Sequence, residues 1–274
     1  MVRLTEKTIS DILSGANPSR EPLGDKHEVC SVHGEFCSSG VRYLGRREIW
    51  TACPECVEIE TANARRADAQ QQADKARERM EAAIQSSAIP LRFVGRTFEN
   101  FKATTAAQKA ALKVLCEYAE TFDQHYKRGT GLILSGLPGT GKSHLAGAVL
   151  QAIMPKRCGL YATCMNLIQN VRGTWRKDSE QSENEVLNAY AKSPLLVLDE
   201  VGVQYGTDGE QTILFDVLDR RYREMMPTIF LTNQAKDGFK QFIGERVYDR
   251  LTQTCRWVSF DWESYRPQAK KDAI

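Results

Sequence analysis

Residues 136–143 (GLPGTGKS) constrain this chain more than any other segment, because they fit the phosphate-binding pattern G-x-x-x-x-G-K-[ST]. An apolar run at 132–134 precedes them, and residues 144–150 continue as a predicted helix. A strand, a Gly-rich loop and a helix in this order surround an anion with backbone N–H groups and a helix N-terminus. The sequence therefore predicts a nucleoside triphosphate site. The predicted contacts are Gly136, Pro138, Gly139, Thr140, Gly141, Lys142, Ser143 and His144.

Acidic residues end a second predicted strand. The apolar run at 195–198 is followed by Asp199 and Glu200, at the kind of strand end where an open α/β sheet binds its ligands. We expect Asp199 to orient Mg²⁺ together with Ser143, and Glu200 to polarise an attacking water. Asn233 ends another predicted strand, and its amide could hold that water or sense the γ-phosphate. This set predicts hydrolysis of ATP, and it disfavours a small-molecule kinase.

Helical and strand patterns alternate through the rest of this region. The predicted helices cover 106–125, 165–176, 185–191 and 212–222, and the predicted strands cover 158–162, 195–198, 228–233 and 257–260. Such alternation indicates a parallel sheet with helices on both faces, which is an α/β fold.

Two pairs of possible metal ligands lie near the beginning of the chain. Cys30 and His33 form one pair with two residues between them, and Cys53 and Cys56 form the other. Each pair suits a tight turn that presents two ligands to one Zn²⁺, and the segment between the pairs could fold as a hairpin. Cys37 is an alternative ligand that would replace His33 in a four-cysteine site. Unrelated reduced thiols are the competing interpretation.

The composition divides the chain into three predicted parts. Residues 1–56 are predicted to form the zinc-binding module, residues 57–88 a helical linker, and residues 89–274 the ATPase domain. The linker contains no glycine, and it ends at a break before Pro90. The net charge of +2 gives no argument for nucleic acid. No apolar run approaches the roughly 18 residues that a membrane helix needs. We therefore expect a cytoplasmic protein without a membrane partner.

Five short segments together resemble the DnaC/IstB family of AAA+ ATPases. They are residues 98–101 (FENF), 198–204 (LDEVGVQ), 231–233 (LTN), 244–251 (GERVYDRL) and 262–266 (WESYR). The last two resemble the helicase-loader branch in particular, and the cysteine and histidine spacing resembles phage or prophage versions of the loader. The resemblance covers residues 89–266.

This resemblance implies an ATP-dependent loader that places a hexameric replicative helicase on single-stranded DNA and uses ATP binding and hydrolysis as a switch for assembly and release. The N-terminal module would contact the helicase, and the protein would assemble as an open ring or spiral. An IstB-type ATPase helper of a transposase is the alternative, and the zinc-like module disfavours it.

The resemblance also implies roles for three arginines and a set of DNA contacts. Arg250 would reach the nucleotide of a neighbouring subunit, with Arg246 as the alternate, and Arg266 would act on the nucleotide of its own subunit. The competing interpretation is that Arg246 and Arg250 only form ion pairs along an exposed helix. The implied contacts to single-stranded DNA are Arg172, Trp175, Arg176, Tyr205 and Thr207.

Overall fold

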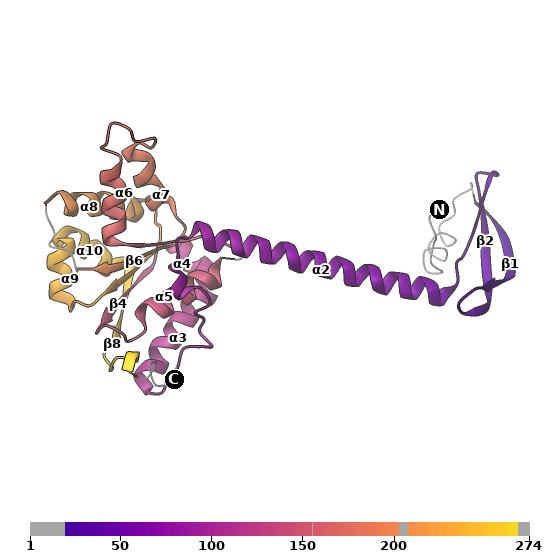
Figure 1. Ribbon diagram of the computed structural model, residues 1–274, viewed down its shortest axis with the longest axis horizontal. Coiled ribbons are helices and arrows are strands. Elements are labelled where there is room, and N and C mark those ends of the chain that lie inside the picture. The colour runs from indigo at the N-terminus through magenta and orange to yellow at the C-terminus, as the bar shows by residue number, and fades with distance from the viewer. Residues whose placement is uncertain (1–19, 155, 203–207, 268–274) are drawn as a thin grey trace. The chain divides into compact units, whose positions relative to one another are not determined.

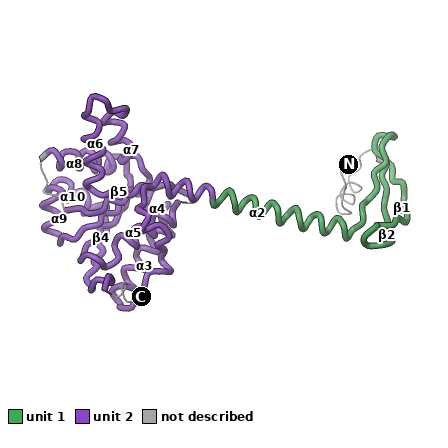
Figure 2. The backbone as a smooth tube through the Cα atoms, viewed as in Figure 1, with its two compact units in different colours: residues 1–77 green, residues 78–274 purple. Residues whose placement is uncertain are grey.

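The computed structural model describes residues 20–154, 156–202 and 208–267 of the 274-residue chain. The chain divides into two compact units, residues 1–77 and 78–274 (Figure 2). The division falls inside one helix, α2 (Pro54–Ser86). The three-part division into 1–56, 57–88 and 89–274 therefore stays a prediction.

The N-terminal unit contains a three-stranded antiparallel sheet, β1 (Arg20–Cys30), β2 (Gly34–Tyr43) and β3 (Arg47–Trp50). The predicted hairpin between the two ligand pairs is present as β2 and β3. Gly40 pairs with Trp50, and a Cβ at Gly40 would lie 2.7 Å from the indole ring. Glycine at this position therefore lets the ring cover the backbone of β2.

Helix α2 follows directly, and the predicted helical linker corresponds to it. Its sequence is rich in strong helix formers, and none of its residues is buried. Near its end, Met80, Ala83 and Ile84 pack against the core of the second unit. The helix end is thus part of that unit.

The second unit is built on a five-stranded parallel sheet with the order β5-β6-β7-β4-β8. The strands are β4 (Gly131–Gly136), β5 (Leu160–Thr163), β6 (Leu196–Val201), β7 (Thr228–Thr232) and β8 (Cys255–Phe260). The central strands are apolar and buried, as expected for a sheet that is covered on both faces. The predicted α/β fold is confirmed.

Helices cover the two faces of this sheet (Figure 1). They are η1 (Leu91–Phe93), α3 (Ala106–Glu120), α4 (Phe122–Arg128), α5 (Lys142–Ile153), α6 (Cys164–Gly173), α7 (Glu183–Lys192), α8 (Asp208–Arg223), α9 (Lys236–Ile243) and α10 (Glu245–Thr254). One apolar core lies between the sheet and helices α3 and α5. A second core lies on the other face of the sheet, between the sheet and the five helices from α6 through α10. Consecutive residues of β7 enter different cores: Leu231 belongs to the first core and Phe230 to the second.

The helices differ from the sequence-based expectations in two places described here. The predicted helix over 106–125 is interrupted at Thr121, which ends α3 and precedes α4. Helix α9 was not predicted from the sequence. Among the described residues, no helix is long and apolar enough to cross a membrane.

A buried arginine joins three elements of this unit. The Arg221 side chain on α8 is 1% exposed. Its guanidinium donates hydrogen bonds to the carbonyls of Tyr190, Ala191, Ser193 and Pro227 and to the Thr228 hydroxyl. The end of α7 and the start of β7 are thereby held to α8.

Candidate active site

The phosphate-binding loop lies between β4 and α5, as predicted. Gly139 and Gly141 have φ angles of 82° and 96°, which L-residues with a side chain rarely adopt. A Cβ at Gly139 would lie 2.1 Å from Ser264 Oγ, and one at Gly141 would lie 2.6 Å from the Phe101 ring. Glycine is therefore required at both positions by backbone conformation and by close packing.

Lys142 begins α5 and is folded onto the loop. Its Nζ donates to the carbonyls of Gly136 at 2.7 Å and Leu137 at 2.8 Å. Burial lowers the pKa of Lys142 to about 8, although Asp199 opposes the shift. The ammonium is therefore mostly charged at neutral pH, and phosphate oxygens could replace the two carbonyls as its acceptors.

Ser143 and Asp199 meet beside the loop, as predicted. The Ser143 hydroxyl donates to Asp199 Oδ2 at 3.0 Å. A hydroxyl at the start of α5 and a carboxylate on β6 are the oxygen ligands that Mg²⁺ prefers when it also binds phosphate. These two residues therefore fit a magnesium ion.

Glu200 has an unusual backbone. Its φ is 59°, and the pairing between β6 and β7 shifts register between Leu198 and Val201. Its backbone N–H donates to Asp199 Oδ1 at 2.7 Å, and its side chain is exposed. Residues with φ above zero that are not glycine cost energy and cluster at functional sites. The positive φ of Glu200 coincides with this irregularity in the pairing of β6.

A cavity of about 750 Å³ connects these groups. Of the predicted nucleotide contacts, those from Pro138 to His144 line it, and Gly136 contributes its carbonyl to Lys142. Asp199, Glu200 and Asn233 line it from the ends of β6 and β7. The Nε2–H of the His144 ring donates to the Thr97 carbonyl at 2.9 Å, which fixes the side chain in the cavity wall.

Two other walls of the cavity come from segments outside the phosphate-binding loop and the strand ends. Phe93, Arg96 and Phe101 line it from the segment before α3. The C-terminal segment forms the opposite wall, because the Trp262 indole donates to the Thr140 carbonyl and the Tyr265 N–H to the Gly139 carbonyl, both at 3.0 Å. These contacts bring Arg266 to the cavity.

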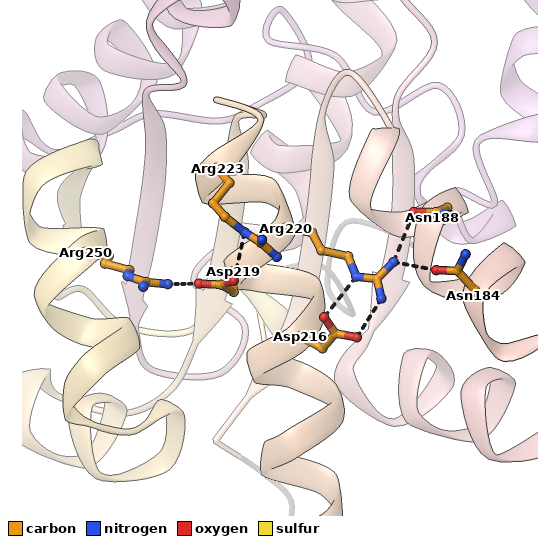
Figure 3. Close-up of polar contacts among 7 residues, drawn as sticks. All are labelled: Asn184, Asn188, Asp216, Asp219, Arg220, Arg223 and Arg250. Atoms are coloured by element: carbon orange, nitrogen blue, oxygen red, sulfur yellow. Dashed lines mark hydrogen bonds and ion pairs between the residues drawn. The ribbon is translucent and has the colours of Figure 1, made fainter.

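The two arginines on α10 do not line this cavity. Arg250 forms an ion pair with Asp219 on α8, and Asp219 also pairs with Arg223 (Figure 3). The Arg250 guanidinium lies 5.1 Å from the centroid of the Tyr222 ring. Arg246 is exposed, and no described residue is its partner. The competing interpretation, in which Arg250 only pairs along its own helix, does not describe this contact, because Asp219 is on α8.

The four predicted zinc ligands come together in the N-terminal unit. Their ligand atoms all lie within 4.8 Å of one another. The His33 Nδ1 atom lies 3.7, 3.6 and 3.3 Å from the sulfurs of Cys30, Cys53 and Cys56, and the sulfurs of Cys30 and Cys56 are 3.6 Å apart. A tetrahedral zinc site would place these atoms about 3.6–3.8 Å apart. The alternative ligand Cys37 is exposed on β2 and lies outside the cluster.

Groups around this cluster also suit a metal. Hydrogen bonds from the backbone of Val32 and His33 lower the pKa of Cys30 to about 6, which favours the thiolate form that metals bind. The other ring nitrogen of His33 lies 3.6 Å from a carboxylate oxygen of Glu55. A carboxylate in this position commonly orients a metal-binding histidine.

The proposed DNA contacts lie at the end of α6. Trp175 is 59% exposed, and its indole N–H donates to Glu183 at 2.6 Å. Arg172 pairs with Glu210 at 3.3 Å. The predicted helix over 165–176 included Trp175 and Arg176. In the structure α6 ends at Gly173, so both residues lie after the helix. Tyr205 and Thr207 lie outside the described residues.

Residues 67–273 match the family of IstB-like ATP-binding proteins. The chain belongs to this family. The replicative helicase loader DnaC of Buchnera aphidicola subsp. Schizaphis graminum is 33% identical over 196 residues, which cover 71% of this chain and 78% of that protein. The replicative helicase loader DnaC of Escherichia coli K12 is 36% identical over 172 residues, which cover 62% of this chain and 69% of that protein.

Solved structures agree on the fold. The crystal structure of the DnaC helicase loader aligns with a TM-score of 0.57 at 23% identity, over 62% of this chain and 99% of that one. AMPPCP-bound DnaA from Aquifex aeolicus aligns with a TM-score of 0.54 at 20% identity, over 68% of this chain and 56% of that one. The predicted AAA+ fold and family are confirmed, and the protein is a P-loop ATPase. The cysteine–histidine cluster lies outside the family match.

Proposed function

We propose that this protein is an ATP-dependent loader of a replicative DNA helicase onto single-stranded DNA, in which ATP binding and hydrolysis switch between assembly and release. The observation that carries the proposal is the 33–36% identity to relatives named replicative helicase loaders. The nucleotide cavity and its C-terminal wall lie inside the matched residues. The helicase and single-stranded DNA are the proposed partners, and a cytoplasmic location stays a prediction.

The proposed chemistry follows from the walls of the cavity. Lys142 would bind the β- and γ-phosphates, and Ser143 with Asp199 would hold Mg²⁺, which neutralises charge on the phosphates. Glu200 would polarise the attacking water, because it lines the cavity beside Asp199. Asn233, at the end of the neighbouring strand, would sense the γ-phosphate.

Hydrolysis would be completed by a second subunit. Arg266 lines the cavity of its own chain, which supports a role within one subunit. Arg250 contacts Asp219 and Tyr222 on α8 and does not line its own cavity, so any role at a nucleotide would be toward a neighbour, with Arg246 as the alternate. Assembly into an open ring or spiral, and single-stranded DNA that favours it, would then raise a weak basal hydrolysis rate.

The N-terminal cluster would bind one zinc ion through Cys30, His33, Cys53 and Cys56. The fit of its distances to a tetrahedral site and the Glu55 carboxylate beside His33 support this assignment. Zinc in such a closed site stabilises a fold and performs no chemistry. The resulting rigid module would contact the helicase.

Single-stranded DNA would bind beside α6. The exposed Trp175 ring could stack on a base, and Arg172 and Arg176 could follow the phosphate backbone. Tyr205 and Thr207 complete the proposed set.

The proposal is tested by capture and loading with purified proteins. We expect the chain to capture a hexameric replicative helicase in ATP and to place it on single-stranded DNA, as measured by unwinding of an adjacent duplex. Lys142→Ala should abolish loading. Lys113→Ala is the matched control, since Lys113 is an exposed lysine on α3 that pairs only with Glu117 among the described contacts. Capture of a transposase instead of the helicase would indicate the IstB-type function, and capture of neither would refute the proposal.

A further inference from the structure

The carboxylate of Asp199 is held by hydrogen bonds from three elements. Oδ2 accepts from the Ser143 hydroxyl at the start of α5 and from the Tyr161 hydroxyl on β5. Oδ1 accepts from the Glu200 N–H at 2.7 Å. A carboxylate has about four acceptor positions, so these donors within the described residues leave about one for a metal-bound water. The orientation of the group is therefore fixed before nucleotide binds.

Tyr161 is itself fixed in position. Its side chain is 3% exposed, and its ring centroid lies 6.1 Å from that of Phe93. Its backbone N–H donates at 2.7 Å to the carbonyl of Ser87, the residue that follows α2. Burial, with a smaller contribution from Asp199, raises the pKa of Tyr161 far above neutral pH. The hydroxyl thus remains protonated and can act only as a donor toward this carboxylate.

We propose that Tyr161 is a positioning residue for the magnesium site, and that its hydroxyl holds the Asp199 carboxylate in the orientation that receives the water shell of Mg²⁺. Magnesium requires nearly octahedral geometry at short distances, so a rotated carboxylate would lose its hydrogen bond to a metal-bound water. The inference rests on the nucleotide site of a P-loop ATPase. It does not depend on helicase loading.

Tyr161 contacts two regions of the second unit, one through its backbone and one through its side chain. The edge strand β5 contacts the end of α2 through the Tyr161 backbone and the magnesium site through the Tyr161 side chain. Phenylalanine would keep the ring packing against Phe93 and the backbone hydrogen bond to Ser87. It would remove only the hydroxyl, so the substitution isolates the bond to Asp199.

The test compares nucleotide affinity with and without magnesium. The dissociation constant of a fluorescent ADP analogue is measured for wild type and Tyr161→Phe, once in Mg²⁺ and once in EDTA. We expect the tightening caused by Mg²⁺ to fall by about tenfold in Tyr161→Phe, which is the size of one hydrogen bond to a charged group. Tyr161 lines the cavity, but the proposed phosphate contacts come from Lys142 and the loop, so the affinity in EDTA should not change.

Tyr118→Phe is the matched control. Tyr118 is also 3% exposed in the same unit, and its hydroxyl donates to the Thr130 carbonyl at 2.9 Å, apart from the magnesium site. This variant should show the wild-type tightening by Mg²⁺. In an Asp199→Ala background, Tyr161→Phe should have no further effect on the tightening, because the acceptor is gone.

Three binding results would overturn the proposal. The first is an unchanged magnesium effect in Tyr161→Phe, which includes equal weakening of nucleotide binding in Mg²⁺ and in EDTA. The others are an equal loss in Tyr118→Phe and a loss that persists in the Asp199→Ala background. A Tyr161→Phe protein that does not fold would assign the hydroxyl to folding and would overturn it as well.

Discussion

Replacing Arg221 by lysine should destabilise the second unit far more than the same change at its neighbour Arg220. The Arg221 guanidinium is fully buried and contacts five acceptors, of which four are backbone carbonyls. The carbonyls of Tyr190 and Ala191 belong to the last turn of α7, where no intrahelical donor is available. Arg221 therefore supplies the hydrogen bonds that this buried helix end needs.

The size of the effect follows from the number of acceptors. A lysine ammonium has three donors at one point, so at least two of the five contacts would be lost. Each buried acceptor left without a donor costs about 1–3 kcal/mol. Arg221→Lys should thus lower the free energy of unfolding by about 3 kcal/mol, which corresponds to roughly 6–12 °C in Tm for a unit of this size. Arg221→Met should cost more, because no donor remains.

Arg220 provides the internal control. It lies on the same helix with its side chain 26% exposed, and it pairs with Asp216 and donates to Asn184 and Asn188 (Figure 3). An ion pair this exposed contributes about 1 kcal/mol or less. Thermal and urea unfolding of both lysine variants would measure the difference. Equal losses, or a loss below about 1 kcal/mol for Arg221→Lys, would refute the assignment of Arg221 as the donor for these carbonyls.

Three further predictions concern the nucleotide, the metal and the assembly. Lys142→Ala should abolish nucleotide binding, whereas Glu200→Gln should bind ATP and retain it unhydrolysed, as measured by equilibrium binding and phosphate release; equal affinity of wild type and Lys142→Ala would contradict the site. Elemental analysis should find about one zinc per chain, and Cys53→Ser should lose it while the ATPase unit melts at an unchanged temperature; a native protein that folds without metal would argue against the zinc site. Arg250→Ala should bind ATP normally but hydrolyse it poorly, and mixing it with Lys142→Ala should restore activity, since one chain then supplies the cavity and the other the arginine; no recovery on mixing would leave Arg250 as a partner of Asp219 only.

The parts of the fold that local sequence determines were predicted well. The loop of residues 136–143 and the strand end at Asp199 combine hydrophobic runs with residue types that have few other uses. The pairing of Ser143 with Asp199 followed from the order of the strands, because parallel strands present their carboxyl ends at one edge. The spacing of the two pairs predicts the zinc ligands and also favours His33 over Cys37, and the same four residues lie together in the N-terminal unit.

Other features could not be predicted because their causes lie far away in the sequence. Strand β1 contains many charged residues together with Pro22 and Gly24, so no alternation identifies it, and it is stabilised by pairing with β2. Tyr161 and Arg221 look like an ordinary strand residue and an ordinary surface arginine until Asp199 and the end of α7 are placed beside them. The break at Thr121 was not predicted either, because the local sequence is helical on both sides.

The backbone hydrogen bond between Tyr161 and Ser87 affects where a truncated version of this protein should begin. Strand β5 is an outer strand of its sheet, and outer strands with open backbone groups promote aggregation. The Ser87 carbonyl accepts a hydrogen bond from one of these groups, the Tyr161 N–H, and Met80 and Ile84 pack against the apolar core. A fragment that starts at residue 89 would uncover both, whereas one that starts at residue 78 keeps the cover. The end of α2 therefore protects the outer strand of the sheet, and a fragment of the ATPase unit that includes the end of α2 should aggregate less than one that lacks it.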